Sequence, residues 1–291
     1  MKNRKAIIAT IVLLIVVALL LVGGMIFMMK GNFRVGSKRV STNLVTDEVY
    51  HGSYSRIEVT TDASDIEVKA TDESAVHVTI YGDQERSSVR ESGNNLKVEA
   101  KAKRCFGICF NLTMSKVVVY VPKEYEGELV ITNKYGDIML EEFSSATIKV
   151  EEDCGDVEIR EAKSIDVVNS YGDITIGKVK DVTLRESCGN IKIDYLEKGD
   201  IVNNYGDIEI GWINGEIFID EDCGDIDIRE AVILNDSKID NSFGNITIGR
   251  TNETFIDAKT SLGDVKIDEN YRHAQTTLKL HNSCGDIKVS N

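Results

Sequence analysis

A short motif centred on one glycine recurs nine times in the second half of the chain and constrains the fold more than any other feature. Each copy places Gly before Asp or Asn and then Ile or Val. The motif glycines are Gly136, Gly155, Gly172, Gly189, Gly206, Gly224, Gly244, Gly263 and Gly285, at spacings of 17 to 22 residues. A unit this short cannot close a hydrophobic core alone, so the copies must stack on one another.

Apolar residues alternate with polar ones on both sides of each glycine. Around Gly172 they are Ile165 and Val167 before it, and Ile174 and Ile176 after it. Alternation with a period of two is typical of strands with one buried face. The apolar positions change parity at the Gly-Asp pair, which predicts a turn or bulge there. Gly supplies backbone freedom, and Asp or Asn can cap the turn through local hydrogen bonds.

The pattern predicts an all-β fold, a parallel β-solenoid in which residues 126–291 form nine repeats. Turn residues of stacked copies form columns along the axis, and we expect these columns to be structural. The predicted turn ladder comprises Gly136, Asp137, Gly155, Asp156, Gly172, Asp173, Gly189, Asn190, Gly206, Asp207, Gly224, Asp225, Gly244, Asn245, Gly263, Asp264, Gly285 and Asp286. A β-sandwich is the alternative, but it would not need the same residues at each turn.

A second alternation runs through the copies. The residue before Gly alternates between Tyr and Cys in the first six copies, and the residue three before Gly alternates between Asn and Glu. Either each copy forms one coil, or two copies form one coil of about 34–38 residues. The second arrangement stacks Glu152, Glu186 and Glu221 about 4.8 Å apart, which like-charge repulsion opposes. We therefore favour one copy per coil.

Residues 41–125 predict further strands with a weaker repeat. Segments 56–59, 65–68 and 95–98 alternate well, and Ser64-Asp65-Ile66 resembles a degenerate copy of the motif. Terminal units of a solenoid differ from the internal ones because they must cover its ends. We expect this region to cap the first coil.

An apolar stretch near the N terminus, residues 6–29, has Thr10 as its only polar member. As a helix it spans about 36 Å, enough to cross a bilayer. A cleaved signal peptide is the alternative, but its apolar core would be shorter, about 7–15 residues. We expect residues 1–40 to form a basic tail, one uncleaved transmembrane helix and a juxtamembrane segment. Bases flank both ends of the span, so the positive-inside rule is undecided, although the short basic tail favours a body outside the cytoplasm.

Acidic residues gather in the body of the chain. Residues 41–291 hold 27 basic and 48 acidic residues, a formal charge of −21. Such a body repels nucleic acid and anionic lipid, so we predict no nucleic-acid partner. The charge serves solubility, and it would also attract cations or a basic partner.

The order of these features resembles a bacterial family known as the putative-adhesin or β-strand-repeat domain of unknown function. The resemblance rests on the anchor, the degenerate strands, Val121-Pro122-Lys123 and the serial Gly-Asp-Ile/Val copies, and it covers about residues 45–291. It implies a parallel β-solenoid at a bacterial envelope, sometimes linked to envelope-stress systems, and it carries no catalytic residues. Tyr and Cys before Gly depart from the small polar residues that are commoner in the family.

Four of the six cysteines share the position before the motif glycine: Cys154, Cys188, Cys223 and Cys284. The chain has no Cys-x-x-Cys pair, and a zinc site needs convergent ligands, so we interpret these cysteines as small buried hydrophobes. Cys105 and Cys109 lie four residues apart and could form a local disulfide outside the cytoplasm.

The sequence predicts no cofactor, no metal and no catalytic residue. Calcium-binding β-rolls use a Gly-Gly-x-Gly-x-Asp repeat of nine residues, which is absent, although clusters such as 151–153 with Asp156 could hold a hard cation. The four histidines show no ligand spacing: His51, His77, His273 and His281. The acids recur alike in every copy, whereas a catalytic site would break the repetition, so we predict that the protein is not an enzyme.

We therefore expect a single-pass protein of the bacterial cell membrane with an extracytoplasmic body. The solenoid would act as a non-catalytic scaffold or interaction module, in adhesion or in envelope-stress response. Its expected partners are the membrane and other envelope proteins or surface glycans. The alternative is a glycan-binding or carbohydrate-active β-helix protein, which clustering of Trp212, Tyr195 and Tyr271, or carboxylates gathered on one coil, would favour.

Overall fold

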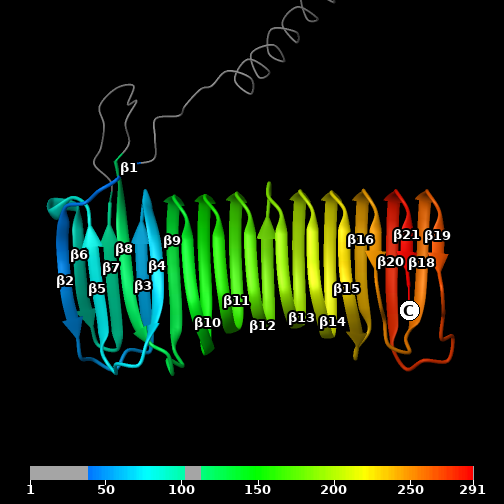
Figure 1. The fold of residues 1–291 in the computed structure, drawn as a ribbon, viewed down its shortest axis with the longest axis horizontal. Coiled ribbons are helices and arrows are strands. Elements are labelled where there is room, and N and C mark those ends of the chain that lie inside the picture. The colour runs from blue at the N-terminus through cyan, green and yellow to red at the C-terminus, as the bar shows by residue number, and fades with distance from the viewer. Residues whose placement is uncertain (1–38, 102–112, 291) are drawn as a thin grey trace, which may run out of the picture. The chain divides into compact units, whose positions relative to one another are not determined.

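The computed structural model describes residues 39–101 and 113–290, which contain 21 strands and one short 3-10 helix (Figure 1). The predicted transmembrane span lies outside these residues, as do Cys105 and Cys109. Within the two described ranges, no helix has the length and apolar character needed to cross a membrane.

The regular part of the body consists of parallel strands that run from one Gly-Asp turn to the next. Their bounds are β9 Glu128–Tyr135, β10 Ile138–Cys154, β11 Val157–Tyr171, β12 Ile174–Glu186, β13 Ile191–Tyr205, β14 Ile208–Cys223, β15 Ile226–Ile233, β16 Ser237–Phe243, β17 Ile246–Ile248, β18 Phe255–Leu262, β19 Val265–Ile267, β20 Thr277–Cys284 and β21 Ile287–Val289. Figure 1 shows them side by side along the body. The chain is a parallel β-solenoid.

One copy of the motif forms one turn of the solenoid, which we call a rung. In the pairing of β10 with β11, Ile138 lies opposite Val157 and Cys154 lies opposite Tyr171. A Tyr copy is therefore the direct neighbour of a Cys copy, and the arrangement with two copies per coil is excluded.

Each rung is a flattened coil, because its strand bends near the middle and returns to the Gly-Asp edge. Residues before and after the bend point into one shared core, as Leu140 and Val150 of β10 do. The core consists of buried Ile, Val and Leu side chains in register from rung to rung. β-Branched side chains suit this environment, and each buried one contributes about 1.5–3 kcal/mol.

The N-terminal strands extend the same stack at its first end. Their bounds are β1 Arg39–Val40, β2 Leu44–Tyr50, β3 Arg56–Thr61, β4 Ser64–Thr71, β5 Val76–Tyr81, β6 Ser87–Ser92, β7 Asn95–Ala100 and β8 Thr113–Pro122, with the 3-10 helix at Gln84–Arg86. Strand β3 pairs in parallel with β7, and β4 with β8, whereas the pairs β2–β5, β5–β8 and β6–β7 are antiparallel. A domain boundary at residue 125 stays a prediction. Strand β3, which precedes this position, pairs directly with β9, which follows it.

Rungs at both ends of the stack depart from the order of the sequence. Strand β20 pairs with β16 on one side and with β18 on the other, so the copy of Gly285 lies between those of Gly244 and Gly263. In the same way, β3 pairs with both β7 and β9. Strands β20 and β3 are inserted between these neighbours and are therefore hydrogen-bonded on both sides.

Candidate functional site

The predicted turn residues lie along one long edge of the solenoid, which we call the Gly-Asp edge. The φ angles of Gly136, Gly172 and Gly206 are +124°, +137° and +136°, a region that side chains resist. A Cβ atom added to Gly172 would lie 2.1 Å from the carbonyl oxygen of Gly155. Backbone therefore stacks directly on backbone at this edge, and only Gly allows it.

The Asp and Asn side chains of the motif link one rung to the next. In each pair the backbone N–H of one Asp or Asn donates to Oδ1 of its neighbour, with N···O distances of 2.7 to 3.4 Å. Asp65 takes part, since its Oδ1 accepts from the N–H of Asp137 at 3.2 Å. Sequence reasoning expected caps within each turn, whereas the structure places the donors in the adjacent rung.

Just inside the edge, Asn and Glu side chains alternate in a buried column. Asn203 Nδ2 donates to the carbonyl oxygens of Gly189 and Gly206, at 3.3 and 3.0 Å. Each Glu uses Oε1 to accept the N–H two residues later, as Glu221 does from Cys223 at 3.1 Å. The column therefore fixes the backbone of the turns from within.

One oxygen of each buried Glu has no hydrogen-bond donor within the described part of the chain. These oxygens are Oε2 of Glu152, Glu186 and Glu221, and Oδ1 of Asn169, Asn203, Asn241 and Asn282 is unpaired in the same way. The strand register places Glu152 opposite Asn169, Glu186 opposite Asn203 and Glu221 opposite Asn241. Each of these Glu residues therefore has, on the next rung, an Asn whose Oδ1 is also unpaired.

Burial favours the protonated form of these Glu side chains. Burial raises the pKa of Glu152 to about 7 and that of Glu221 to about 8, and it also raises the pKa of Glu186. Hydrogen bonds from backbone N–H groups, and from the Asn side chain of the preceding rung, oppose this effect without cancelling it. A protonated carboxyl carries one O–H donor, for which the unpaired Oδ1 of the Asn opposite is an available acceptor.

Outside the column, the residues before Gly form an exposed row along the edge, which we call the aromatic ladder. In spatial order it runs Tyr135, Cys154, Tyr171, Cys188, Tyr205, Cys223, Phe243, Cys284, Leu262. The large members are 52–70% exposed. The cysteines are free and half-buried, so the prediction that they are buried is wrong. Interleaving at the C-terminal end preserves the large–small alternation, which the order of the sequence loses.

The three aromatic residues that would indicate a glycan site do not gather at one place. Tyr195 and Trp212 form an edge-to-face pair with ring centroids 6.3 Å apart. Tyr271 lines a separate groove of about 900 Å³ with Leu234, His273 and other residues. The described residues contain no group of three or more His, Cys, Asp or Glu side chains that could hold a metal ion.

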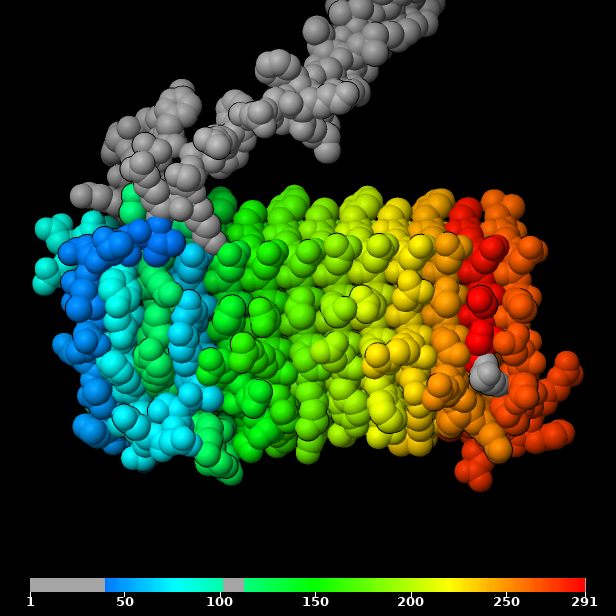
Figure 2. All heavy atoms as spheres, in the orientation of Figure 1, coloured from blue at the N-terminus to red at the C-terminus, as the bar shows by residue number. Residues whose placement is uncertain are grey.

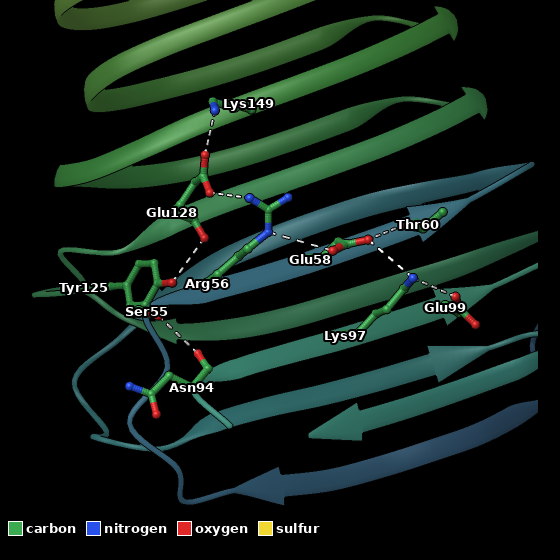
Figure 3. Close-up of polar contacts among 10 residues, drawn as sticks. All are labelled: Ser55, Arg56, Glu58, Thr60, Asn94, Lys97, Glu99, Tyr125, Glu128 and Lys149. Atoms are coloured by element: carbon green, nitrogen blue, oxygen red, sulfur yellow. Dashed lines mark hydrogen bonds and ion pairs between the residues drawn. The ribbon is translucent and has the colours of Figure 1, made fainter. Parts of the chain in front are cut away.

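Polar contacts on the outer face join the first rungs to the regular repeat (Figure 3). The Glu128 carboxylate lies 2.5 Å from Arg56 and 2.8 Å from Lys149, and Lys97 lies 3.5 Å from Glu58. These residues come from β7, β3, β9 and β10. Exposed ion pairs each contribute about 0–1 kcal/mol. This cluster therefore aligns the rungs and shows no feature of a binding site.

The fold and the repeated edge define a repetitive β-solenoid, whose outer side chains form rows across the rungs (Figure 2). Within that class, the chain belongs to the Toastrack DUF4097 family, whose model matches residues 54–291. No curated protein matches it.

Three solved structures are similar to the chain at low identity. A "putative adhesin" from Bacteroides fragilis NCTC 9343 is 16% identical over 86% of this chain and 98% of that one, with a TM-score of 0.44. A "putative adhesin" from Parabacteroides merdae ATCC 43184 is 12% identical over 88% and 100%, with a TM-score of 0.42. A "putative cell adhesion protein" from Clostridium sporogenes ATCC 15579 is 8% identical over 84% and 98%, with a TM-score of 0.27.

Proposed function

We propose that the protein is a non-catalytic interaction module of the bacterial cell envelope. Residues 6–29 anchor it in the cell membrane as a single helix, and the solenoid lies outside the cytoplasm. It serves adhesion or envelope-stress response by presenting a rigid, repetitive surface to other envelope components. The observation that carries this proposal is the repetition itself: the same residue types recur along the Gly-Asp edge on rung after rung, and the described residues contain no group of three or more His, Cys, Asp or Glu side chains that could hold a metal ion.

Two measurements test the location. The full chain should remain in membranes through alkaline carbonate washing, and protease added to intact cells should degrade the solenoid. Release by the wash would contradict the anchor. Complete protection from protease, with degradation after the cells are opened, would place the body inside.

A capture experiment tests the interaction. The full chain, solubilised in a nonionic detergent and immobilised, should retain specific envelope components from extracts of the same cells. The control is a variant with both Tyr171 and Tyr205 changed to Ser, which removes exposed rings without touching the core. Equal recovery on protein-free and protein-bearing beads would contradict the proposal.

Surface glycan binding is the second candidate, and it rests on the contact between Tyr195 and Trp212. Asn214 Nδ2 lies 3.4 Å from the Tyr195 hydroxyl, so polar groups border the exposed indole. Aromatic faces with a few fixed polar groups are the usual elements of a small-molecule site. Affinity electrophoresis in gels containing cell-surface polysaccharide would detect this activity as retardation that Trp212→Ala abolishes.

A further inference from the structure

We propose that the Gly-Asp edge binds a proline-rich, positively charged segment of a partner protein in the polyproline II conformation. This inference rests on the proposed role as an interaction module and names the partner class. The contact surface consists of the aromatic ladder and the adjacent column of Asp side chains.

The first argument is the spacing of the ladder. Neighbouring rungs lie about 4.8 Å apart, and a large side chain stands on every second rung, so the rings are about 9.6 Å apart. Tyr135, Tyr171, Tyr205 and Phe243 occupy four such positions, each more than half exposed. Smaller, half-buried cysteines stand between them. A ligand that fits must repeat its apolar groups at this distance.

Polyproline II has that repeat. The helix has three residues per turn and a rise of 3.1 Å, so every third side chain returns to one face after about 9.3 Å. The difference from the ladder is about 0.3 Å per interval and about 1 Å over the three intervals from Tyr135 to Phe243. Aromatic grooves are the common receptors for such segments, because the ligand is ordered before it binds.

The second argument is charge. Tyr171 and Asp173 flank the same glycine, so their Cα atoms lie no more than about 7.5 Å apart. Asp173, Asp207 and Asp225 are exposed, and each uses Oδ1 in the ladder of hydrogen bonds. A row of negative charge thus runs beside the rings. Lys or Arg on a second face of a polyproline II helix would lie over this row, and the net charge of the body would favour its approach.

The same charge disfavours other occupants. A second copy would bring an identical acidic row against the first, and an anionic lipid surface would be repelled. A neutral glycan would leave the Asp row without a counter-charge. The chain has one proline, Pro122, which lies within β8, so the ligand belongs to another protein.

Fluorescence anisotropy with a labelled peptide of four Pro-Pro-Lys triplets tests the inference. This probe is about 37 Å long in the polyproline II conformation. The ladder from Tyr135 to Leu262 spans eight rung-to-rung steps of about 4.8 Å, or about 38 Å. We expect saturable binding to the full chain in nonionic detergent, and weaker binding at higher salt. A Gly-Gly-Lys peptide of equal charge and a Pro-Pro-Glu peptide should each bind at least ten-fold more weakly.

Matched variants test the aromatic ladder and the Asp column separately. The Tyr171→Ser/Tyr205→Ser double variant should weaken binding at least ten-fold, whereas Trp212→Ser, an exposed aromatic change outside the ladder, should not. Asp173→Asn/Asp207→Asn should also weaken binding. This second change preserves the fold, because Asn190 already supplies the same Oδ1 acceptor to the next rung.

Each remaining outcome decides against the inference. Equal binding of the Gly-Gly-Lys peptide would show that charge alone acts. Binding to neutral polysaccharide, to vesicles of zwitterionic lipid or to a second copy in sedimentation, lost in the double Tyr variant, would assign the ladder to that occupant. If envelope components are captured but the Pro-Pro-Lys peptide does not bind, the inference fails while the proposed function stands. If no envelope component is captured and the peptide does not bind, both the proposed function and the inference are wrong.

Discussion

Replacing Glu221 by Gln tests the protonated state of the buried column. Gln is neutral at every pH and has nearly the shape of a protonated Glu. Its Oε1 can accept from the N–H of Cys223, and its amide can donate to Oδ1 of Asn241 opposite. The variant therefore keeps the hydrogen bonds of the protonated side chain and removes only the ability to ionise.

The magnitude follows from the pKa. Burial raises the pKa of Glu221 from 4.5 to about 8, and each pKa unit corresponds to about 1.36 kcal/mol. A raised folded-state pKa gives stability that is fully present below pH 4.5 and is lost as the pH rises through 8. If Glu221 ionises completely, the free energy of unfolding falls by at most about 5 kcal/mol. Relaxation of the protein around the ionised carboxylate reduces this cost.

Denaturant unfolding at pH 5, 7 and 9, followed by circular dichroism, measures this effect. At pH 5 the free energy of unfolding of Glu221→Gln should lie within about 1 kcal/mol of the parent value. At pH 9 the variant should be more stable by about 2–5 kcal/mol. The exposed Glu209→Gln serves as the control and should show no such trend. A difference that is the same at pH 5 and pH 9, or a variant less stable at pH 9, would refute a protonated column.

Three further predictions concern the Gly-Asp edge. Gly172→Val should reduce the free energy of unfolding by at least about 1–3 kcal/mol in denaturant titrations, because its Cβ would meet a carbonyl oxygen at a φ of +137°; unchanged stability would contradict the stacking. Asp173→Ala should cost about 1 kcal/mol in the same assay, since the N–H of Asn190 loses its acceptor, while Asp173→Asn should cost less. Mild oxidation of the folded body should give no bond between Cys154 and Cys188, because two rungs separate them by about 9.6 Å and a disulfide needs Cα atoms about 4.4–6.8 Å apart; that bond, found by mass spectrometry in a protein of unchanged melting temperature, would be incompatible with the observed register.

The nine glycines and the alternating apolar residues were sufficient to predict the solenoid, because alternation sets the buried face and the Gly-Asp pair sets the turn. The same rules identified Ser64-Asp65-Ile66, which pairs with the motif through Ile66 and Ile138. One copy per rung was favoured on another ground, the repulsion between stacked Glu side chains.

The order of the terminal rungs and the state of the Glu column could not be predicted in this way. Which copy lies beside which depends on long connections, such as residues 268–276 between β19 and β20, whose path no periodicity encodes. Glu152 and its equivalents were expected to be charged and separated by Asn. Their burial and their unpaired oxygens become visible only when neighbouring rungs are in place.

The strand that ends the sequence is not the strand that ends the stack, and this affects how the body responds to force. The last strand, β21, is hydrogen-bonded to β17 on one side and to β19 on the other, as β20 before it is to β16 and β18. A pull on the C terminus therefore cannot peel this strand from an open edge one bond at a time. It must break the hydrogen bonds on both sides of the strand at once. The neighbouring strands therefore hold the C-terminal strands in place.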